Sequence, residues 1–228
     1  MAPLDLEAPI FDSDGVLVDS EAIHIAVEQE LLAEVGLDYD HSEYLSRFVG
    51  LSNTDFYFEL ASDFSARIGG EFPSDFASKL QERAWPRIES ELRAIEGVDR
   101  LVDAFYGGVA VGSSAPIAKL VRKLELTNLS RLFSPHIYSV DHVENGKPAP
   151  DLFLHAARQL GVRPERCAVI EDSINGVLAA RAANMIPIGF VGGSHADVGL
   201  SDRLKANGAA FVVSSHSEII DLLPTPAS

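Results

Sequence analysis

The chain has 228 residues, which is enough for one large domain or for a core domain that carries a smaller one. Its 34 Asp and Glu residues outnumber its 18 Lys and Arg residues, and the formal net charge is −16. This acidity, together with the lack of a basic run, argues against nucleic acids and anionic membranes as partners. No apolar segment approaches the ~20 residues of a membrane span, so we expect a cytoplasmic location.

The first predicted strand is an apolar stretch that ends just before Asp12 and Asp14. Acidic residues two apart occur elsewhere in the chain, so the spacing alone carries no information. At the carboxyl end of a strand, however, alternation directs both side chains to one side, and Gly15 permits a sharp turn after them. Pro9 is poorly tolerated in a central strand, so we expect this strand to be short or distorted at its start.

Two chemical roles are open to this pair of carboxylates. Their mutual repulsion is relieved most simply by a divalent cation with oxygen ligands. One Asp can attack phosphorus as a nucleophile, while the other protonates the leaving alcohol and later deprotonates water. The alternative is a pair that only forms a turn in an acidic protein.

The region that follows the pair is predicted to be entirely helical. Its first helix has an apolar stripe that stops at Gly36: Ile23, Val27, Leu31 and Val35. Further helical stretches follow Ser52 and Pro73, and no strand is predicted there. We therefore expect a helical domain over residues 19–94, inserted into a core domain of residues 1–18 and 95–228.

From Gly108 onward, short apolar runs alternate with helical stretches. The predicted strands are residues 109–111, 136–138, 167–170, 186–190 and 209–213, and the predicted helices are residues 116–126, 150–160 and 174–184. Such alternation is typical of an α/β fold with a parallel sheet. The single cysteine, Cys167, begins one of the apolar runs, which excludes a disulfide framework and indicates a buried thiol.

Four short segments carry a family resemblance. They are FDSDGVLVDS at residues 11–20, GVAVGS at 108–113, GKPAPD at 146–151 and VIEDS at 169–173. In this order they resemble the four motifs of the haloacid dehalogenase superfamily, in the branch of β-phosphoglucomutase and small-molecule phosphatases. The resemblance implies a Rossmann-like parallel sheet with an all-helical cap domain inserted between the first and second motifs.

The resemblance also implies roles for individual residues. Asp12 would be the nucleophile that becomes an aspartyl phosphate, and Asp14 the acid and base. Ser113 and the amide of Ser114 would bind the phosphoryl oxygens near a helix N-terminus. Lys147 would balance the charge of the clustered carboxylates and the phosphate.

The cofactor implied by the resemblance is Mg²⁺. Its ligands would be Asp12, the backbone carbonyl of Asp14, and Asp172. Glu171 would either hold a metal-bound water or orient Lys147. Ser173 is expected to cap the helix that follows.

We expect the substrate to be a small phosphorylated metabolite, either a sugar phosphate or a phosphorylated sugar acid. In the cap, His24, Arg47 and Asn53 are the candidate substrate-binding residues. Arg47 has an alternative as a structural ion pair. For the whole protein we expect a monomer or a weak dimer.

Three rival functions fit the sequence less well than a phosphatase does. A dehalogenase of the family lacks the second acid, so Asp14 argues against that chemistry. A β-phosphoglucomutase is closer, because His24 matches a histidine of its cap, but Asn53 stands where the mutase has a phosphate-binding arginine. A non-catalytic binding or regulatory protein on the same fold is disfavoured by the intact acidic residues and Lys147.

Overall fold

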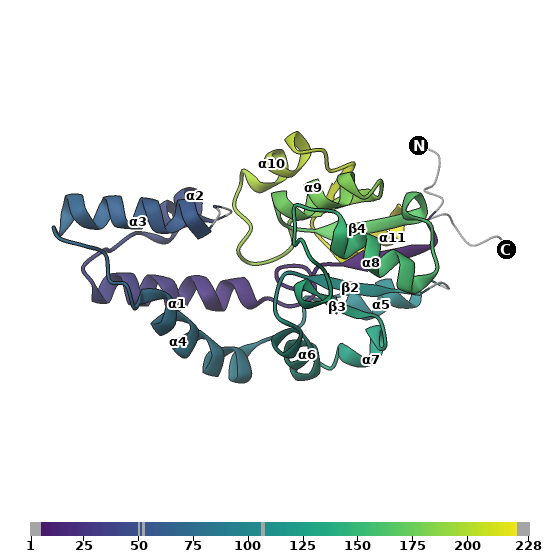
Figure 1. The fold of residues 1–228 in the computed structure, drawn as a ribbon, viewed down its shortest axis with the longest axis horizontal. Helices are drawn as coiled ribbons and strands as arrows, with labels where there is room; N and C mark the ends of the chain where they lie inside the picture. The colour runs from purple at the N-terminus through teal and green to yellow at the C-terminus, as the bar shows by residue number, and fades with distance from the viewer. Residues whose placement is uncertain (1–5, 50, 52, 106–107, 223–228) are drawn as a thin grey trace. The chain divides into compact units, whose positions relative to one another are not determined.

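The structure is a computed structural model, which describes residues 6–49, 51, 53–105 and 108–222. These residues form two compact units (Figure 1). The core unit contains the described residues up to Asp19 and those from Leu92 onward, while the helical unit runs from Ser20 to Glu91. No helix within the described ranges is long and apolar enough to cross a membrane.

The core unit is built on a parallel sheet of six strands in the order β3-β2-β1-β4-β5-β6. The strands are β1 (Ala8–Phe11), β2 (Ala110–Ser113), β3 (Ile137–Ser139), β4 (Cys167–Glu171), β5 (Ile186–Phe190) and β6 (Phe211–Val213). The predicted α/β fold is therefore confirmed. The strand order reverses between β1 and β4, and ligands of such sheets bind outside the carboxyl ends of the strands at this switch point.

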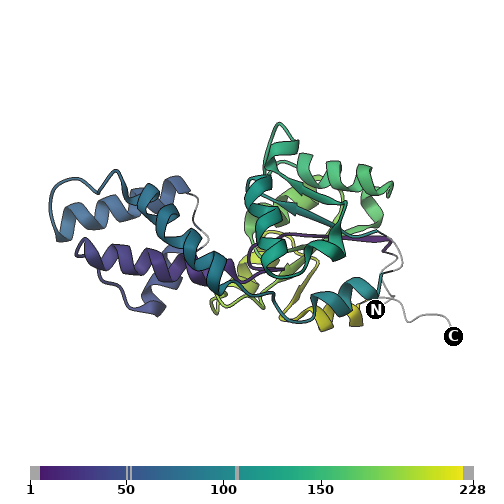
Figure 2. The same ribbon diagram turned by 90° about the horizontal axis from the view of Figure 1, so that it is seen from below.

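Helices cover both faces of this sheet (Figure 2). They are α5 (Val98–Asp103), α6 (Ile117–Leu126), α7 (Ser130–Phe133), α8 (Asp151–Leu160), α9 (Ile174–Ala182), α10 (Leu200–Ala206) and α11 (His216–Asp221), with short 3₁₀ helices η1 (Val140–His142) and η2 (Pro164–Arg166). Successive residues of one strand supply opposite cores: Ile10 packs with α8 and α9, whereas Phe11 packs with α6 and α7. Cys167 is fully buried and free, as predicted.

Strand β1 contains Pro9 although it is a central strand. With four residues the strand is short, which is one of the two expected outcomes, and its start pairs with β4 from Ala8 onward. In a parallel ladder, successive amides point alternately to the two neighbouring strands. The amide of Asp12 donates to the Ile170 carbonyl of β4, so the nitrogen of Pro9 faces the opposite side, toward β2. Pairing with β2 begins only at Ile10 and Ala110, so Pro9 removes no ladder hydrogen bond on that side.

The helical unit contains α1 (Ser20–Glu34), α2 (His41–Phe48), α3 (Asn53–Arg67) and α4 (Phe76–Glu91). Its described residues include no strand, as predicted. Val27 and Leu31 of the predicted stripe lie in its apolar core. The first helix ends just before Gly36, whose φ of +86° suits glycine and ends the helix.

Candidate active site

The first acidic pair lies where β1 ends and a tight turn begins. Asp12 is 8% exposed and directly follows the last strand residue. The turn is closed by hydrogen bonds from the amides of Leu17 and Val18 to the carbonyl of Ser13. Gly15 has a φ of +78°, and a side chain there would overlap the carboxylate of Asp172. Glycine is therefore required at this position both by the backbone and by the packing.

Lys147 connects the end of β1 with the end of β4. Its ammonium group forms ion pairs with the carboxylate of Asp12 and with Glu171, the latter at 2.5 Å, and its side chain is 4% exposed. Burial lowers the pKa of Lys147, but the two carboxylates more than offset this effect and keep the pKa above its ordinary value. Lys147 is therefore a buried, permanently charged cation that lies 4.9 Å from the ring centroid of Phe153.

Glu171 is fully buried and is engaged on both oxygens. One oxygen pairs with Lys147, and the other accepts hydrogen bonds from the amide and the hydroxyl of Ser173 at 3.1 and 2.8 Å. The hydroxyl of Ser173 in turn accepts from the amide of Gly176, so Ser173 caps α9 as predicted. Of the two roles expected for Glu171, these contacts fit the orientation of Lys147.

Asp172 follows β4 and is 9% exposed. Its Oδ2 atom lies 3.0 Å from Nε2 of His195, a residue of the loop between β5 and α10. His195 could not be selected from the sequence. A histidine after two glycines has no recognisable spacing to the four motifs, so only the folded chain brings it to Asp172.

Ser113 is the last residue of β2 and is 1% exposed, whereas Ser114 is exposed. The hydroxyl of Ser113 accepts a hydrogen bond from the amide of Ala115 at 3.1 Å. At the start of α6, the amide of Ile117 already donates to Asp141 at 2.8 Å. That helix amide is thus occupied, and Ser113 and Ser114 remain the candidate donors to an anion at this strand end.

Asp14 forms an ion pair with Lys123 of α6, which the sequence analysis also missed. The side chain of Lys123 is 6% exposed and that of Asp14 is 21% exposed. In the sequence, Lys123 looks like an ordinary lysine of an amphipathic helix, and nothing marks it as the partner of a residue more than a hundred positions away. Between the two aspartates, the hydroxyl of Ser13 is fully buried and has no hydrogen-bond partner within the described part of the chain.

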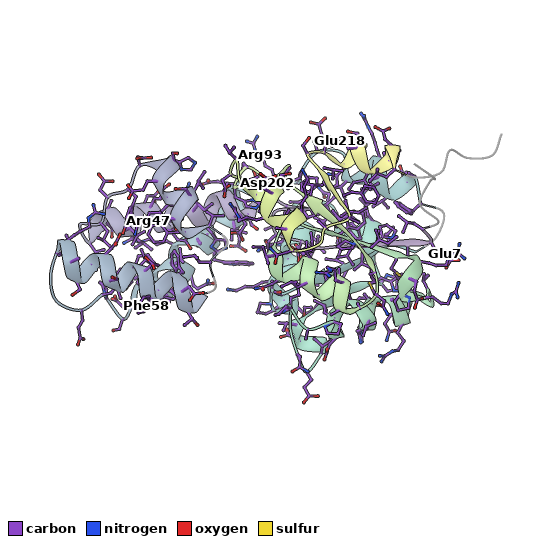
Figure 3. All side chains as sticks on the ribbon, turned by 90° about the horizontal axis from the view of Figure 1, so that it is seen from above. Glu7, Arg47, Phe58, Arg93, Asp202 and Glu218 are labelled. Atoms are coloured by element: carbon purple, nitrogen blue, oxygen red, sulfur yellow. The ribbon has the colours of Figure 1, made fainter. Side chains whose placement is uncertain are left out.

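Three predicted substrate-binding residues belong to the helical unit. His24 is a partly buried residue of α1, and Asn53 begins α3, but its side chain lies outside what the structure describes. Arg47 of α2, labelled in Figure 3, forms ion pairs with Asp63 at 2.9 Å and Glu43 at 3.2 Å. The hydrogen bond to Asp63 raises the pKa of Arg47 above its ordinary value. These contacts match the alternative reading of Arg47 as a structural ion pair.

The acidic cluster has the donor chemistry of a hard divalent cation. Burial raises the pKa of Asp12 well above its usual value; Lys147 opposes the shift, and the carboxylates of Glu171, Asp172 and Asp14 add to it. Across the described ranges, no three His, Cys, Asp or Glu side chains gather as a ready metal site. A site of two carboxylates, Asp12 and Asp172, completed by the main-chain carbonyl of Asp14 is compatible with that finding.

The fold and this cluster define the class of the protein. Buried carboxylates and a lysine at the switch point of a parallel sheet are typical of an α/β enzyme that acts on a charged ligand. A family model described as haloacid dehalogenase-like hydrolase matches residues 6–184. The chain belongs to this family, and it is a phosphomonoester hydrolase that resembles phosphatases of small phosphorylated metabolites.

Three similar proteins illustrate the relationship. The 6-phosphogluconate phosphatase of Escherichia coli (strain K12) is 30% identical over 191 residues, which are 83% of this chain and 85% of that protein. The fructose-1-phosphate phosphatase YqaB of the same organism is 31% identical over 181 residues, which are 77% of this chain and 92% of that protein. A HAD family hydrolase from Deinococcus radiodurans R1, solved with bound phosphate and sodium, has a TM-score of 0.80 at 35% identity and covers 98% of this chain and 99% of its own.

Proposed function

We propose that this protein is a magnesium-dependent phosphatase that hydrolyses a sugar phosphate or a phosphorylated sugar acid through an aspartyl phosphate on Asp12. The observation that carries the proposal is the buried ion pair between Asp12, at the end of a central strand, and Lys147. Burial raises the pKa of Asp12, and Lys147 opposes this rise, so the lysine favours the ionised carboxylate that a nucleophile requires. Two of the similar phosphatases are named for a phosphorylated sugar acid and a sugar phosphate, which supports this substrate class.

In the first step, a carboxylate oxygen of Asp12 attacks phosphorus in line with the ester bond. That bond breaks, its electron pair leaves with the alcohol oxygen, and Asp14 gives this oxygen a proton. Ser113 and Lys147 bind the phosphoryl oxygens and stabilise the charge that they carry in the transition state.

In the second step, Asp14 removes a proton from water, whose oxygen attacks the phosphorus of the aspartyl phosphate. The bond to Asp12 breaks, and inorganic phosphate is released. The ion pair with Lys123 holds the carboxyl group of Asp14 in place.

Phosphatases of this family generally use a divalent metal. In our proposal Asp12, Asp172 and the main-chain carbonyl of Asp14 hold Mg²⁺. When bound, the cation neutralises phosphoryl charge and holds the phosphate in line with Asp12. Glu171 acts on Lys147 and does not ligate the metal directly.

We further propose that residues 19–94 serve as a cap that selects the substrate for the core of residues 1–18 and 95–228. His24 and Asn53 are the first candidates for substrate contact. Arg47 reaches a substrate anion only if it exchanges one of its carboxylate partners, Asp63 or Glu43, for that anion.

The test is phosphate release from 6-phosphogluconate, fructose 1-phosphate and β-glucose 1-phosphate, with and without Mg²⁺. We expect free phosphate from at least one sugar ester, and only with Mg²⁺. Formation of glucose 6-phosphate in quantity from β-glucose 1-phosphate would assign the mutase reaction instead. D12N is expected to lose at least about 10³-fold in kcat while its circular dichroism stays unchanged. A D12N variant that loses much less than about 10³-fold in kcat would reject Asp12 as the nucleophile.

A further inference from the structure

The loop after β5 contains a sequence, Gly192-Gly193-Ser194-His195, that no role described so far explains. It brings Nε2 of His195 to 3.0 Å from Oδ2 of Asp172. The side chains are 6% and 10% exposed, so water competes little for this contact. The interaction is therefore part of the interior of the core unit.

The loop is held in place by its backbone as well as by His195. A Cβ atom on Gly193 would lie 2.8 Å from the carbonyl oxygen of Gly15 and 2.7 Å from the His195 ring. A Cβ atom on Gly15 would in turn lie 2.7 Å from Cε1 of His195. Two glycines thus let the loop approach the turn that follows Asp12, and the imidazole ring packs against both of them.

Ser194 anchors the same loop at a second point. Its hydroxyl donates to Oδ2 of Asp19 at 2.5 Å, and its amide donates to Oδ1 of Asp19 at 3.3 Å. Asp19 is the last residue of the core unit before the helical unit begins. Adjacent residues of one loop therefore bind Asp19 and Asp172, which fixes His195 relative to both acidic segments of the site.

We propose that His195 is a positioning residue that fixes the orientation of the Asp172 carboxylate for binding Mg²⁺. A carboxylate on a single side chain can rotate, and a hydrogen bond to one of its oxygens fixes the direction of the other. Loss of such a partner typically costs about 10-fold to 100-fold in metal affinity. This inference rests on the proposed magnesium site.

The test compares three variants of the full-length protein by calorimetric titration with MgCl₂ in the absence of substrate. H195Q keeps a donor at the position of Nε2 and should bind Mg²⁺ within about 3-fold of the wild type. H195L lacks a donor, and in H195N the amide is too short to reach Asp172. Both should weaken Mg²⁺ binding by at least about 10-fold.

Activity provides the second readout. For H195L and H195N, the Mg²⁺ concentration for half-maximal activity should rise at least about 10-fold, while kcat at saturating Mg²⁺ stays within about 5-fold of the wild type. The control is H155L, because the ring of His155 packs against those of Tyr138 and His142, which have no role in the proposed site. H155L should bind Mg²⁺ as the wild type does.

The outcomes separate this inference from the proposed function. If the wild type binds Mg²⁺ and releases phosphate while H195N binds Mg²⁺ equally well, the positioning role of His195 is wrong. An H195Q variant as weak as H195N would also overturn it, since the donor would then be irrelevant. If the wild type itself neither binds Mg²⁺ nor releases phosphate, the proposed function fails first.

Discussion

Lys123 and Asp14 show how a single residue from outside the motifs enters the site. Lys123 is almost completely buried and comes from α6, one helix beyond the strand end that carries Ser113. A buried lysine needs an anionic partner, because its charge has lost most of its hydration. The pair therefore stabilises the fold as well as the position of the Asp14 carboxyl group.

We predict that K123M destabilises the protein by about 1–3 kcal/mol, because it leaves the partly buried Asp14 carboxylate without its cation. Urea denaturation followed by circular dichroism measures this change. The double variant D14N/K123M should recover part of the loss, since the unpaired charge is then absent. K205M, which changes an exposed lysine of α10, should stay within about 0.5 kcal/mol of the wild type. Equal effects of K123M and K205M would contradict the prediction.

The candidate site could be predicted from the sequence where a residue follows a strand or, as with Lys147, lies in a recognisable motif. Asp12, Ser113 and Asp172 end or follow parallel strands, and such ends meet at one edge of a sheet. Lys123 and His195 carry no such signal. Lys123 meets Asp14, and His195 meets Asp172, only because a helix and a loop pack against the strand ends in the folded chain. No local sequence pattern indicates that packing.

At the scale of elements, the turn after β1 depends on one glycine. Gly15 combines a positive φ with a close approach of the Asp172 carboxylate and the His195 ring. Gly161, at the end of α8, also has a positive φ, 71°, but no atom lies within 4 Å of the position of its Cβ. An alanine at Gly161 therefore introduces backbone strain alone, whereas an alanine at Gly15 introduces both backbone strain and steric overlap.

We predict that G161A costs about 1 kcal/mol, the strain of a left-handed alanine, and leaves kcat unchanged. G15A adds the overlap with Asp172 and should cost more than about 3 kcal/mol or displace the turn, with at least a 10-fold loss of kcat/KM. Urea denaturation and steady-state kinetics provide the two measurements. If G15A matched G161A in both, the close packing around Gly15 would have no consequence.

Helices α1 and α2 are joined by a hydrogen bond from the hydroxyl of Tyr44 to Glu28 at 2.5 Å. Burial raises the pKa of Glu28 from 4.5 to about 7, the Tyr44 hydrogen bond opposes this shift, and Glu21 adds to it. Between pH 4.5 and about pH 7, Glu28 therefore keeps its proton in the folded protein but loses it in the unfolded chain. The stability contributed by this group is complete below pH 4.5 and is lost as the pH rises to about 7.

The corresponding prediction concerns E28Q, which keeps the shape of the side chain but cannot ionise. Relative to that of the wild type, its free energy of unfolding should increase by about 1–2 kcal/mol from pH 5 to pH 8, because only the wild type loses stability over this range. Urea denaturation at both pH values measures the difference. E82Q, on an exposed face of α4, is the matched control and should show no such trend. A constant difference between E28Q and the wild type would refute the prediction.

The elements themselves were largely predictable, because apolar periodicity decides between helix and strand. The helices predicted at 116–126, 150–160 and 174–184 appear as α6, α8 and α9, with ends shifted by no more than two residues. Pro9 was the exception. The sequence does not show toward which neighbouring strand the backbone nitrogen of a residue points. It therefore could not indicate that the nitrogen of Pro9 points toward β2, which has no residue paired with Pro9.

For the whole molecule, the two chain segments that join the units run side by side. The amide of Asp19 donates to the carbonyl of Arg93, the amide of Ile95 donates to the carbonyl of Leu17, and Val18 forms an antiparallel bridge with Ala94. All of these residues belong to the core unit. Hydrogen bonds within the core unit thus hold together the two chain segments that flank the helical unit.

We predict that a variant in which a short Gly-Gly turn replaces residues 20–91 folds as an independent core. Its circular dichroism should show the helices and the sheet of the core, and its urea unfolding should be cooperative. If residues 19–94 select the substrate, this variant should hydrolyse acetyl phosphate but lose preference among sugar phosphates. An unfolded core would contradict the structural part of the prediction, and an unchanged preference would contradict the role of the cap.

The paired segments at Val18 and Ala94 also bear on how such a protein can diversify. The chain leaves the core at Val18 and returns to it at Ala94, and these two residues form an antiparallel bridge. For the core, the whole helical unit is therefore equivalent to one long hairpin loop. The entropic cost of closing a loop grows only slowly with its length, so helical units of different size can occupy this position at similar cost. If the helical unit selects the substrate, as we propose, recombination at this junction exchanges one helical unit for another and changes the substrate without altering the candidate site of the core.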